Sequence, residues 1–362
     1  MFSATKIIAL FSVFLHQNTA FSFSTLNHQR VDHKSFLKSD GKKRCYFGLE
    51  GRGNDGVARQ FNGNRLDTLM LKNDDDDDDD EFTLVGNDEK LELSKISSVK
   101  VSTLSGDDVS LGSLLLPDDG SKKTSILVCL SHFGDFNAWE VAQQYIASFS
   151  TGDLDSECNV ILVGIGSVAS ANKFADDLDL AKESRIQLVA DETGAVTEVC
   201  GCYKGWLAID KEHAKKWPAA DVNPYIKLFG MIFGIGSPGT IGRVLYGYVG
   251  DKEGDFRSRK WVVDALLTGT SKGRFPKITS DAFEGVPEES GLRPFELATL
   301  RAQTGIHIVL NWGKLGPTDG DLFTRMGGTF VFRDGECIYE YYDKGILTYA
   351  PMSEVYKAAR KN

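Results

Sequence analysis

The sequence predicts an α/β fold in which parallel strands alternate with helices. Three apolar runs, at residues 125–130, 159–165 and 186–190, have the length and continuity of buried strands. Each run is followed by a segment with helical spacing, and strands separated by helices form parallel βαβ units. Antiparallel hairpins are expected on both sides of this body.

The first hairpin is expected over Val99–Leu114. Polar and apolar residues alternate from 98 to 104, and Gly106-Asp107-Asp108 provides a turn before a second strand at 109–114. After the strand at 125–130, apolar residues recur at helical spacing from Trp139 to Ile146.

We expect the helix after the first buried strand to begin at Asn137. With Glu140 at the third helical position, Asn137 as N-cap would give a capping-box arrangement. The helices after the second and third buried strands are expected at 171–180 and 195–203.

The C-terminal part predicts a second hairpin and a closing helix. Gly328–Arg333 and Cys337–Tyr342 flank a turn at Asp334-Gly335, and a helix is expected at Ser353–Lys361. The segment of about 120 residues before this hairpin is too long for a structureless loop. Helical patterns in it lie at 224–236, 238–248, 261–267 and 294–304. We therefore expect a thioredoxin-like domain over 82–362 with a helical insertion at about 205–326.

Composition and charge narrow the class of protein. The 362 residues are 41% hydrophobic and 25% charged, which is typical of a soluble globular protein. After residue 20, no run of about 18 uncharged apolar residues occurs, which argues against a membrane-spanning helix. The net charge of -10 argues against nonspecific nucleic-acid binding. We expect no nucleic-acid partner.

The N-terminal residues have the features of a targeting leader. Residues 1–20 contain Lys6, an apolar stretch and a small residue, Ala20, as expected of a signal peptide. Residues 21–81 begin at Phe21, continue as a basic transit-like stretch and end in an acidic block, which is typical of a solvated linker. Together they resemble the bipartite plastid-targeting leader of algae. The alternative is secretion with a disordered pro-segment.

Cysteine usage indicates a reducing compartment. Cys45 lies in the leader, and the odd number of cysteines in the body is too small for a disulfide scaffold. These body cysteines are Cys129, Cys158, Cys200, Cys202 and Cys337. Cys129 and Cys337 fall inside expected strands, so we expect them in the core.

Cys200 and Cys202, separated only by Gly201, are the pair of cysteines that lie close together in the sequence. Residues two apart on a regular helix point in different directions and cannot bond. Gly201 near the helix end could unwind the segment into a redox-active Cys-x-Cys motif. The alternative is two packed thiols in a reducing compartment.

Two glycine-rich strings loosely match the dinucleotide fingerprint. They are Gly164-x-Gly166-x-x-Ala169 and Gly234-x-Gly236-x-x-Gly239, but no acidic residue lies where the ribose carboxylate belongs. Tight turns explain both strings. The six histidines show no metal-ligand spacing with cysteines or acids, so we expect neither a cofactor nor a metal.

Several blocks together resemble the peroxiredoxin-like branch of the AhpC/TSA family. They are the hairpin Val99–Leu114, the strand, loop and helix of Ile126–Tyr145, the strand Val160–Ser167, Gly327–Val331, Asp343-Lys344-Gly345 and Pro351. The plastid and cyanobacterial members with a long helical insertion are especially similar, because they share the string found at Gly234–Thr240. The resemblance implies a thioredoxin-like fold and thiol redox chemistry, with thioredoxin or a glutathione-type thiol as reductant.

The resemblance also implies that the usual nucleophile is missing. In active members a Cys-x-x-Cys, or its first Cys alone, opens the first helix, where the helix N-terminus lowers the thiol pKa. Here Asp135 and Ala138 occupy these positions. His132 lies beside them and either donates a hydrogen bond to a ligand or to Asp135, or is a structural histidine. Peroxidase activity is therefore doubtful.

Two functions remain open. One is a plastid thiol oxidoreductase or antioxidant protein that uses Cys200 and Cys202. The other is a catalytically silent thioredoxin-fold module for binding or assembly at the thylakoid. The apolar segment Phe229–Ile235 is either the core of the insertion or a docking face for a protein or a thylakoid surface.

Overall fold

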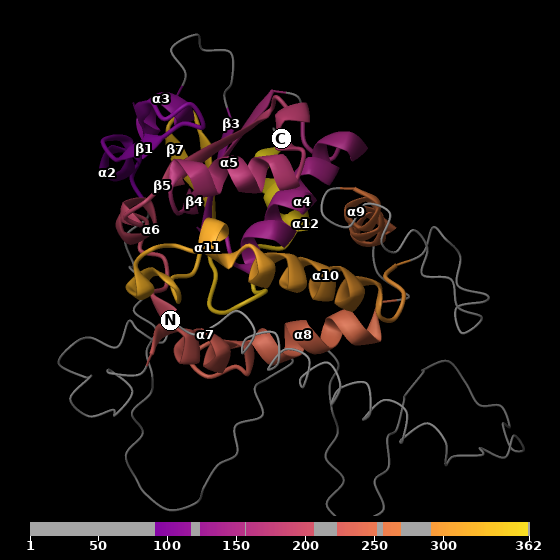
Figure 1. The fold of residues 1–362 in the computed structure, drawn as a ribbon. Helices are drawn as coiled ribbons and strands as arrows, with labels where there is room; N and C mark the ends of the chain where they lie inside the picture. The colour runs from indigo at the N-terminus through magenta and orange to yellow at the C-terminus, as the bar shows by residue number, and fades with distance from the viewer. Residues whose placement is uncertain are drawn as a thin grey trace, which may run out of the picture. The chain divides into compact units, whose positions relative to one another are not determined.

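A seven-stranded mixed sheet organises the domain in the computed structural model (Figure 1). The structure describes residues 91–116, 124–155, 157–205, 223–251, 256–268 and 291–360, which belong to one compact unit. The leader, Cys45 and the acidic block expected from the sequence lie outside the described residues, as do parts of the insertion. Among the described helices, none is long and apolar enough to cross a membrane.

The strand order is β2-β1-β5-β4-β3-β6-β7. Strands β3, β4 and β5 are parallel, and β6 and β7 continue the sheet antiparallel from β3. The predicted parallel centre and C-terminal hairpin are confirmed. The strands are β1 (Lys100–Ser102), β2 (Asp108–Ser110), β3 (Thr124–His132), β4 (Cys158–Ile165), β5 (Ile186–Asp191), β6 (Gly328–Arg333) and β7 (Glu336–Tyr342).

The first hairpin is shorter than predicted. Strands β1 and β2 pair antiparallel, but the chain leaves the sheet after Ser110. Ser110 caps the short helix α3 (Leu111–Leu115), because its side chain accepts a hydrogen bond from the amide of Ser113. The second half of the expected strand at 109–114 is therefore helical, and it buries Leu111 and Leu115 on the sheet.

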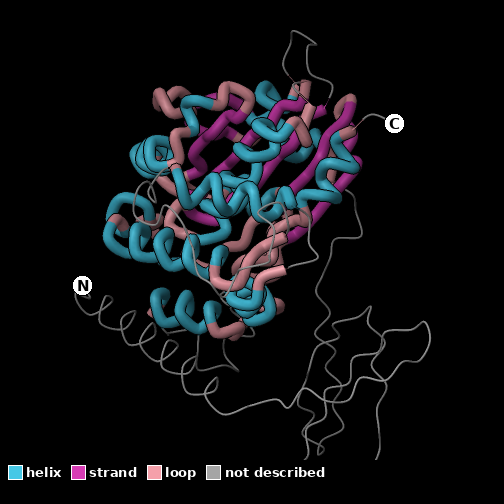
Figure 2. Tube along the Cα trace, turned by 90° about the vertical axis from the view of Figure 1, so that its right-hand side faces the viewer, coloured by secondary structure: helices cyan, strands magenta, loops and turns pink. Residues whose placement is uncertain are grey.

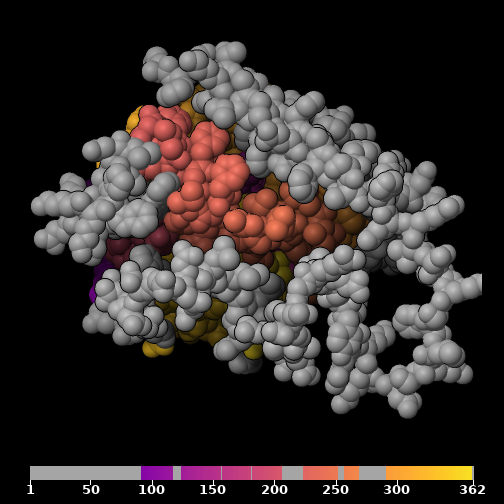
Figure 3. Space-filling model, turned by 90° about the horizontal axis from the view of Figure 1, so that it is seen from below, coloured from indigo at the N-terminus to yellow at the C-terminus, as the bar shows by residue number. Residues whose placement is uncertain are grey.

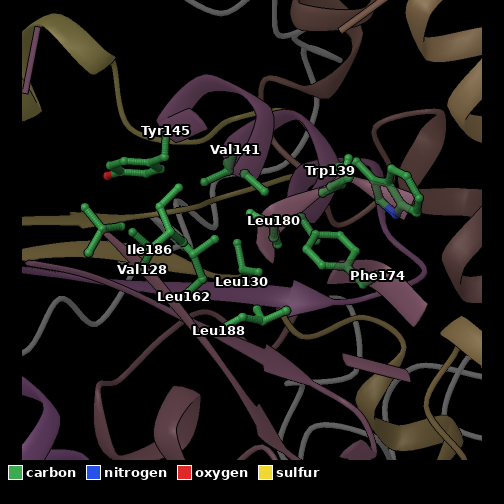
Figure 4. Packing of buried hydrophobic residues seen from close by; sticks show 14 of the residues in the cluster. Val128, Leu130, Trp139, Val141, Tyr145, Leu162, Phe174, Leu180, Ile186 and Leu188 are labelled. Atoms are coloured by element: carbon green, nitrogen blue, oxygen red, sulfur yellow. The ribbon is translucent and has the colours of Figure 1, made fainter. Parts of the chain in front are cut away.

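Two hydrophobic cores lie on opposite faces of the sheet. Alternate residues of one strand point to opposite faces, so Val128 contributes to one core and Cys129 to the other. The first core joins the sheet to α4 (Phe136–Thr151), α5 (Val168–Asp177) and α12 (Met352–Ala359). Figure 4 shows Trp139 and Tyr145 of α4 over this face. The second core joins the sheet to α2 (Leu93–Ser97), α3 and α6 (Ala195–Val199).

Among the described residues, the insertion forms five α-helices, of which the first four overlap the predicted helices and the last was not predicted. They are α7 (Pro224–Ile232), α8 (Thr240–Val249), α9 (Phe256–Leu267), α10 (Glu296–Leu310) and α11 (Trp312–Leu315). Helices α9 and α10 pack on α4, α11 packs on α5, and α8 packs on α10. Figures 1 and 2 show α7, α8, α10 and α11 at one end of the sheet. This part of the insertion lies beside the N-terminus of α4, whereas α9 packs on the C-terminal half of α4.

Candidate functional site

Asp135 is the N-cap of α4. Its carboxylate accepts hydrogen bonds from the amide of Asn137 at 3.4 Å and from the hydroxyl of Ser131 at 2.5 Å. The prediction that Asn137 caps the helix is wrong, because the carboxylate two residues earlier already occupies the first-turn amides. Asp135 is a structural cap in this position, and Ala138 is fully buried behind it.

The side chain of Asn137 instead connects the start of α4 to the chain after β7 through two polar contacts. Its amide group contacts the carbonyl of Gly345 at 3.5 Å, and its oxygen accepts a hydrogen bond from the amide of Leu347. The carboxylate of Glu140, which was expected in a capping box, binds Arg301 of α10 at 2.6 Å. Both side chains expected to cap α4 are therefore used for tertiary contacts.

The loop between α7 and α8 hydrogen-bonds to Ile346, in the chain after β7. The amide of Ile346 donates to the hydroxyl of Ser237 at 2.8 Å, and the hydroxyl of Thr240 donates to the carbonyl of Ile346 at 3.1 Å. Ser237 and Thr240 are fully buried. The Gly234–Thr240 string thus joins the insertion to the chain after β7 through these hydrogen bonds. Its predicted tight turns are confirmed by positive φ at Gly234, Gly236 and Gly239.

His132 lies under aromatic residues of the insertion. Its Nε2 lies 3.2 Å from the carbonyl oxygen of Phe323, and its ring makes an edge contact with Trp312 at 5.5 Å between centroids. Burial lowers the pKa of His132, although Asp135 and the Phe323 carbonyl oppose this effect. His132 is fully buried, and Asp135 bonds to Ser131 rather than to it. The N-terminus of α4 is therefore closed.

Asp343 is a second buried carboxyl group near this end of α4. Its Oδ1 has no hydrogen-bond partner among the described residues. Burial and the charge of Asp135 raise the pKa of Asp343 to about 8. Asp343 is therefore largely protonated at neutral pH. Sequence reasoning noted it only within the family resemblance, because nothing local shows that its carboxyl group is buried.

Cys129, Cys200 and Cys202 form a buried thiol cluster. The sulfur atoms of Cys129 and Cys200 lie 3.9 Å apart, and the thiol of Cys129 also contacts that of Cys202. All three side chains are buried, and the described cysteines all carry free thiols. Sequence reasoning singled out the Cys200–Cys202 pair and placed Cys129 in the core. The structure adds Cys129 to this pair.

The chain reversal at the end of α6 explains how Cys200 and Cys202 can both contact Cys129 of β3. Cys200 is the C-cap of α6, and Gly201 adopts a left-handed φ of 71°. This reversal lets the amide of Cys202 bond to the carbonyl of Thr197, and it returns the chain to the sheet. The expected helix 195–203 thus ends early, and Gly201 turns the chain at its end. The redox-active Cys-x-Cys predicted from the sequence stays a prediction.

The pKa values of Cys129 and Cys202 disfavour their thiolates. Contacts with the other two thiols and burial all raise the pKa of Cys129 well above its usual value. The contact with Cys129 lowers the pKa of Cys202, but burial and the neighbouring Cys200 outweigh it, so the pKa of Cys202 is also raised. Because the thiolate is the reactive form, Cys129 and Cys202 are intrinsically slow nucleophiles.

The first glycine of the string Gly164-x-Gly166-x-x-Ala169 packs against an aromatic ring. The ring of Phe133 fills the space beside Gly164, where a Cβ would lie 2.2 Å from the ring. Gly164, in β4, therefore makes room for the Phe133 ring of the loop that follows β3. Within the described ranges, no group of three or more His, Cys, Asp or Glu side chains is arranged to hold a metal ion.

Comparisons with known proteins identify the family. The family model described as AhpC/TSA antioxidant enzyme matches residues 146–345, a range that begins after Asp135 and Ala138 and includes Cys200 and Cys202. No curated protein matches the chain. A solved structure described as MTB DsbF in its mixed oxidized and reduced forms is 17% identical, covers 30% of this chain and 71% of its own, and has a TM-score of 0.22. Since the family model spans more than half of the sequence, the chain belongs to the AhpC/TSA antioxidant enzyme family with its thioredoxin-like fold.

Proposed function

We propose that this protein is a plastid thiol-redox member of the family, whose dithiol lies in the Cys129–Cys200–Cys202 cluster rather than at the N-terminus of α4. The observation that carries the proposal is the 3.9 Å separation of the Cys129 and Cys200 sulfurs. This is contact distance for two thiols, and a disulfide bond requires about 2.05 Å. Side-chain rotation and a small movement of α6 would close the gap.

The proposed reaction is a two-electron oxidation. A peroxide oxidises one thiol to a sulfenic acid and releases water or an alcohol. A neighbouring thiol then displaces water from the sulfenic acid and forms the disulfide. A dithiol protein of the thioredoxin type, or two molecules of glutathione, would reduce the disulfide by thiol exchange and leave as the oxidised partner.

Access to the cluster requires α6 to open. This helix has only five residues, and Gly201, at its end, is exposed. Glu198 holds the segment through surface ion pairs with Lys204 at 3.3 Å and Arg325 at 3.4 Å. Pairs of this kind contribute little, about 0–1 kcal/mol each, so local opening costs less than global unfolding. We infer slow oxidation that is limited by opening.

The test counts thiols in the folded full-length protein. The folded protein is treated with mild peroxide, and its thiols are then blocked with N-ethylmaleimide in denaturant, because the described thiols are buried. We expect two of the six thiols to be lost per chain. Cys129→Ser should abolish the loss, because Cys129 contacts both other thiols. Cys158→Ser and Cys337→Ser remove buried thiols outside the cluster and serve as matched controls. Peroxide consumption should be no faster than that of an ordinary exposed thiol.

Each outcome distinguishes the proposal from its alternative. An unchanged loss of two thiols in Cys129→Ser, with loss abolished in Cys200→Ser and Cys202→Ser, would restore the pair predicted from the sequence. No loss in the unmodified protein would favour a silent binding or assembly module. The closed N-terminus of α4, with Asp135 4% exposed, is the observation that favours this second function.

A partner surface is proposed on α7 and α8. Six large apolar side chains on and between these helices are more than half exposed, and Figure 3 shows the two helices together on one face. They are Ile226, Phe233, Ile235, Ile241, Leu245 and Val249. The surface includes part of the Phe229–Ile235 segment singled out in the sequence, and it supports a role in contact with a protein or thylakoid surface.

A further inference from the structure

A cavity of about 670 Å³ lies between α4, the α8–α9–α10 part of the insertion and the length of α12. Its volume is in the usual range for small-molecule sites. It is on the α4 face of the sheet, whereas the thiol cluster belongs to the core on the other face. The cavity therefore has no part in the thiol chemistry proposed above.

The cavity is lined by more positive than negative charge. Its basic side chains are Arg243, Arg257, Arg301, Lys357 and Arg360, and its acidic side chain is Asp153. This balance is opposite to that of the whole chain, whose net charge is -10. A local excess of cations in an acidic protein favours an anionic ligand.

Two of the cations are already neutralised by carboxylates. Arg257 pairs with Asp153 at 3.0 Å, and Arg301 pairs with Glu140 at 2.6 Å. Arg243 and Lys357 are exposed, and neither forms an ion pair with a described residue. The positive charge of Arg243 reaches the neighbouring Tyr349. These two side chains supply unbalanced charge at the cavity.

Neutral donors also face this region without acceptors. Gln144 is 8% exposed, and its Nε2 has no hydrogen-bond partner among the described residues. The N-terminus of α12 has no side-chain cap, and the cavity lining includes Met352 and Ser353 of its first turn. Uncapped first-turn amides favour anions. A buried donor without a partner costs free energy unless a ligand or water satisfies it.

Aromatic side chains form the rest of the lining. Trp261 and Tyr246 come from the insertion, and Tyr349 and Tyr356 come from the chain around α12. The hydroxyl of Tyr349 donates to Glu140 at 2.7 Å, and that of Tyr356 lies 2.5 Å from the hydroxyl of Ser148. The two tyrosine rings are held in place by these hydroxyl contacts, so their faces and edges can contact an apolar ligand.

We propose that this cavity binds an aromatic organic anion that carries a phosphate or carboxylate group. The acidic group would interact with Arg243, Lys357, Gln144 and the first turn of α12. The aromatic body would pack against Trp261 and the tyrosines. Neither an apolar molecule without charge nor an inorganic anion without a ring uses both parts of the site.

Isothermal titration calorimetry on the full chain tests this proposal with 1-naphthyl phosphate as the probe. Inorganic phosphate carries only the acidic group of the probe, and 1-naphthol carries only its aromatic ring system. Both should bind at least about tenfold more weakly than the probe. Arg243→Gln and Lys357→Gln should each weaken binding of 1-naphthyl phosphate by about tenfold. Both residues are exposed, so neither change should impair folding. Lys100→Gln removes an exposed charge on β1 as the matched control and should have no effect.

Gln144→Leu gives a second measurement that does not depend on charge. It removes the buried donor while keeping a similar side-chain volume. It should weaken the binding of 1-naphthyl phosphate without changing the binding of 1-naphthol. Three results would each overturn the proposal: affinity of 1-naphthol equal to that of its phosphate, affinity of inorganic phosphate equal to that of the probe, or equal effects of Arg243→Gln and Lys100→Gln. None of these results affects the assignment of the thiol cluster.

Discussion

A protonated carboxyl group at Asp343 makes stability depend on pH. Its pKa is raised from 3.8 to about 8, so the folded state retains a proton that the unfolded state releases between these values. A raised acid pKa gives stability that is present below about pH 4 and is lost as pH rises through 8. We expect the free energy of unfolding to fall by up to about 1.4 kcal/mol per pH unit across this range.

Urea denaturation between pH 5 and 8 measures this slope. Asp343→Asn keeps the shape of the side chain and removes its titration, so the contribution of Asp343 to the slope should disappear in this variant. Asp264→Asn, at a surface ion pair with Lys260, is the matched control and should keep the wild-type slope. The same slope in Asp343→Asn and the wild type would show that Asp343 is ionised in the folded protein.

At the scale of elements, local patterns in the sequence predicted the strands well and the helix ends less well. The runs at 125–130, 159–165 and 186–190 are β3, β4 and β5 within two residues, because continuous apolar runs of this length suit strands buried on both faces. The start of α4 was misplaced because both Asp135 and Asn137 are good N-caps. Only the tertiary contact of Asn137 with Leu347 decides between them.

The candidate site was predicted only in part because its members are distant in sequence. Cys129 and Cys200 are separated by 71 positions, and their contact depends on the packing of α6 against β3. The alternation along β3 could have placed Cys129 on the same face as Leu127, but no local signal places α6 over that face. The anion cavity was missed for the same reason, since it joins α4, the insertion and α12.

The attachment of the insertion depends on the buried ion pair between Glu140 and Arg301. The guanidinium binds both carboxylate oxygens, at 2.6 and 3.0 Å, and also donates to the carbonyl of Arg243. Burial lowers the pKa of Arg301, but the charge of Glu140 outweighs it and raises the pKa. Arg301 therefore stays charged inside the domain.

Arg301→Ala should destabilise the protein by about 3–5 kcal/mol, because it leaves the carboxylate of Glu140 buried without its partner. Urea denaturation measures the change. Lys260→Ala breaks an exposed ion pair in the same insertion and should cost at most about 1 kcal/mol. Equal costs for the two substitutions would show that the insertion is held by its apolar contacts rather than by this pair.

At the scale of the whole molecule, the sheet separates the thiol cluster from the proposed anion-binding cavity. The thiol cluster lies with α6 on one face, and the anion cavity lies with α4 and α12 on the other. The insertion closes the N-terminus of α4 and also forms two walls of the cavity. One segment of the chain thus both covers the N-terminus of α4 and lines the cavity.

The cellular compartment decides whether the thiols begin reduced, and the leader predicts a plastid. The features expected of a signal peptide at 1–20, the junction at Phe21 and the basic stretch that follows occur in the order expected for entry in two steps. We expect residues 1–73 fused to a fluorescent reporter to deliver it to the plastid. The same fusion beginning at residue 21 should leave the reporter in the cytosol, because the first step is lost.

Phe21→Ala in the longer fusion tests the second step by itself. It leaves the apolar stretch of the signal peptide intact, so the reporter should still enter the secretory route but should stop before the plastid. Secretion of the unaltered fusion would contradict the plastid assignment. The cluster of Cys129, Cys200 and Cys202 would then meet an oxidising environment, where thiols 3.9 Å apart would be oxidised permanently to a structural disulfide rather than cycling.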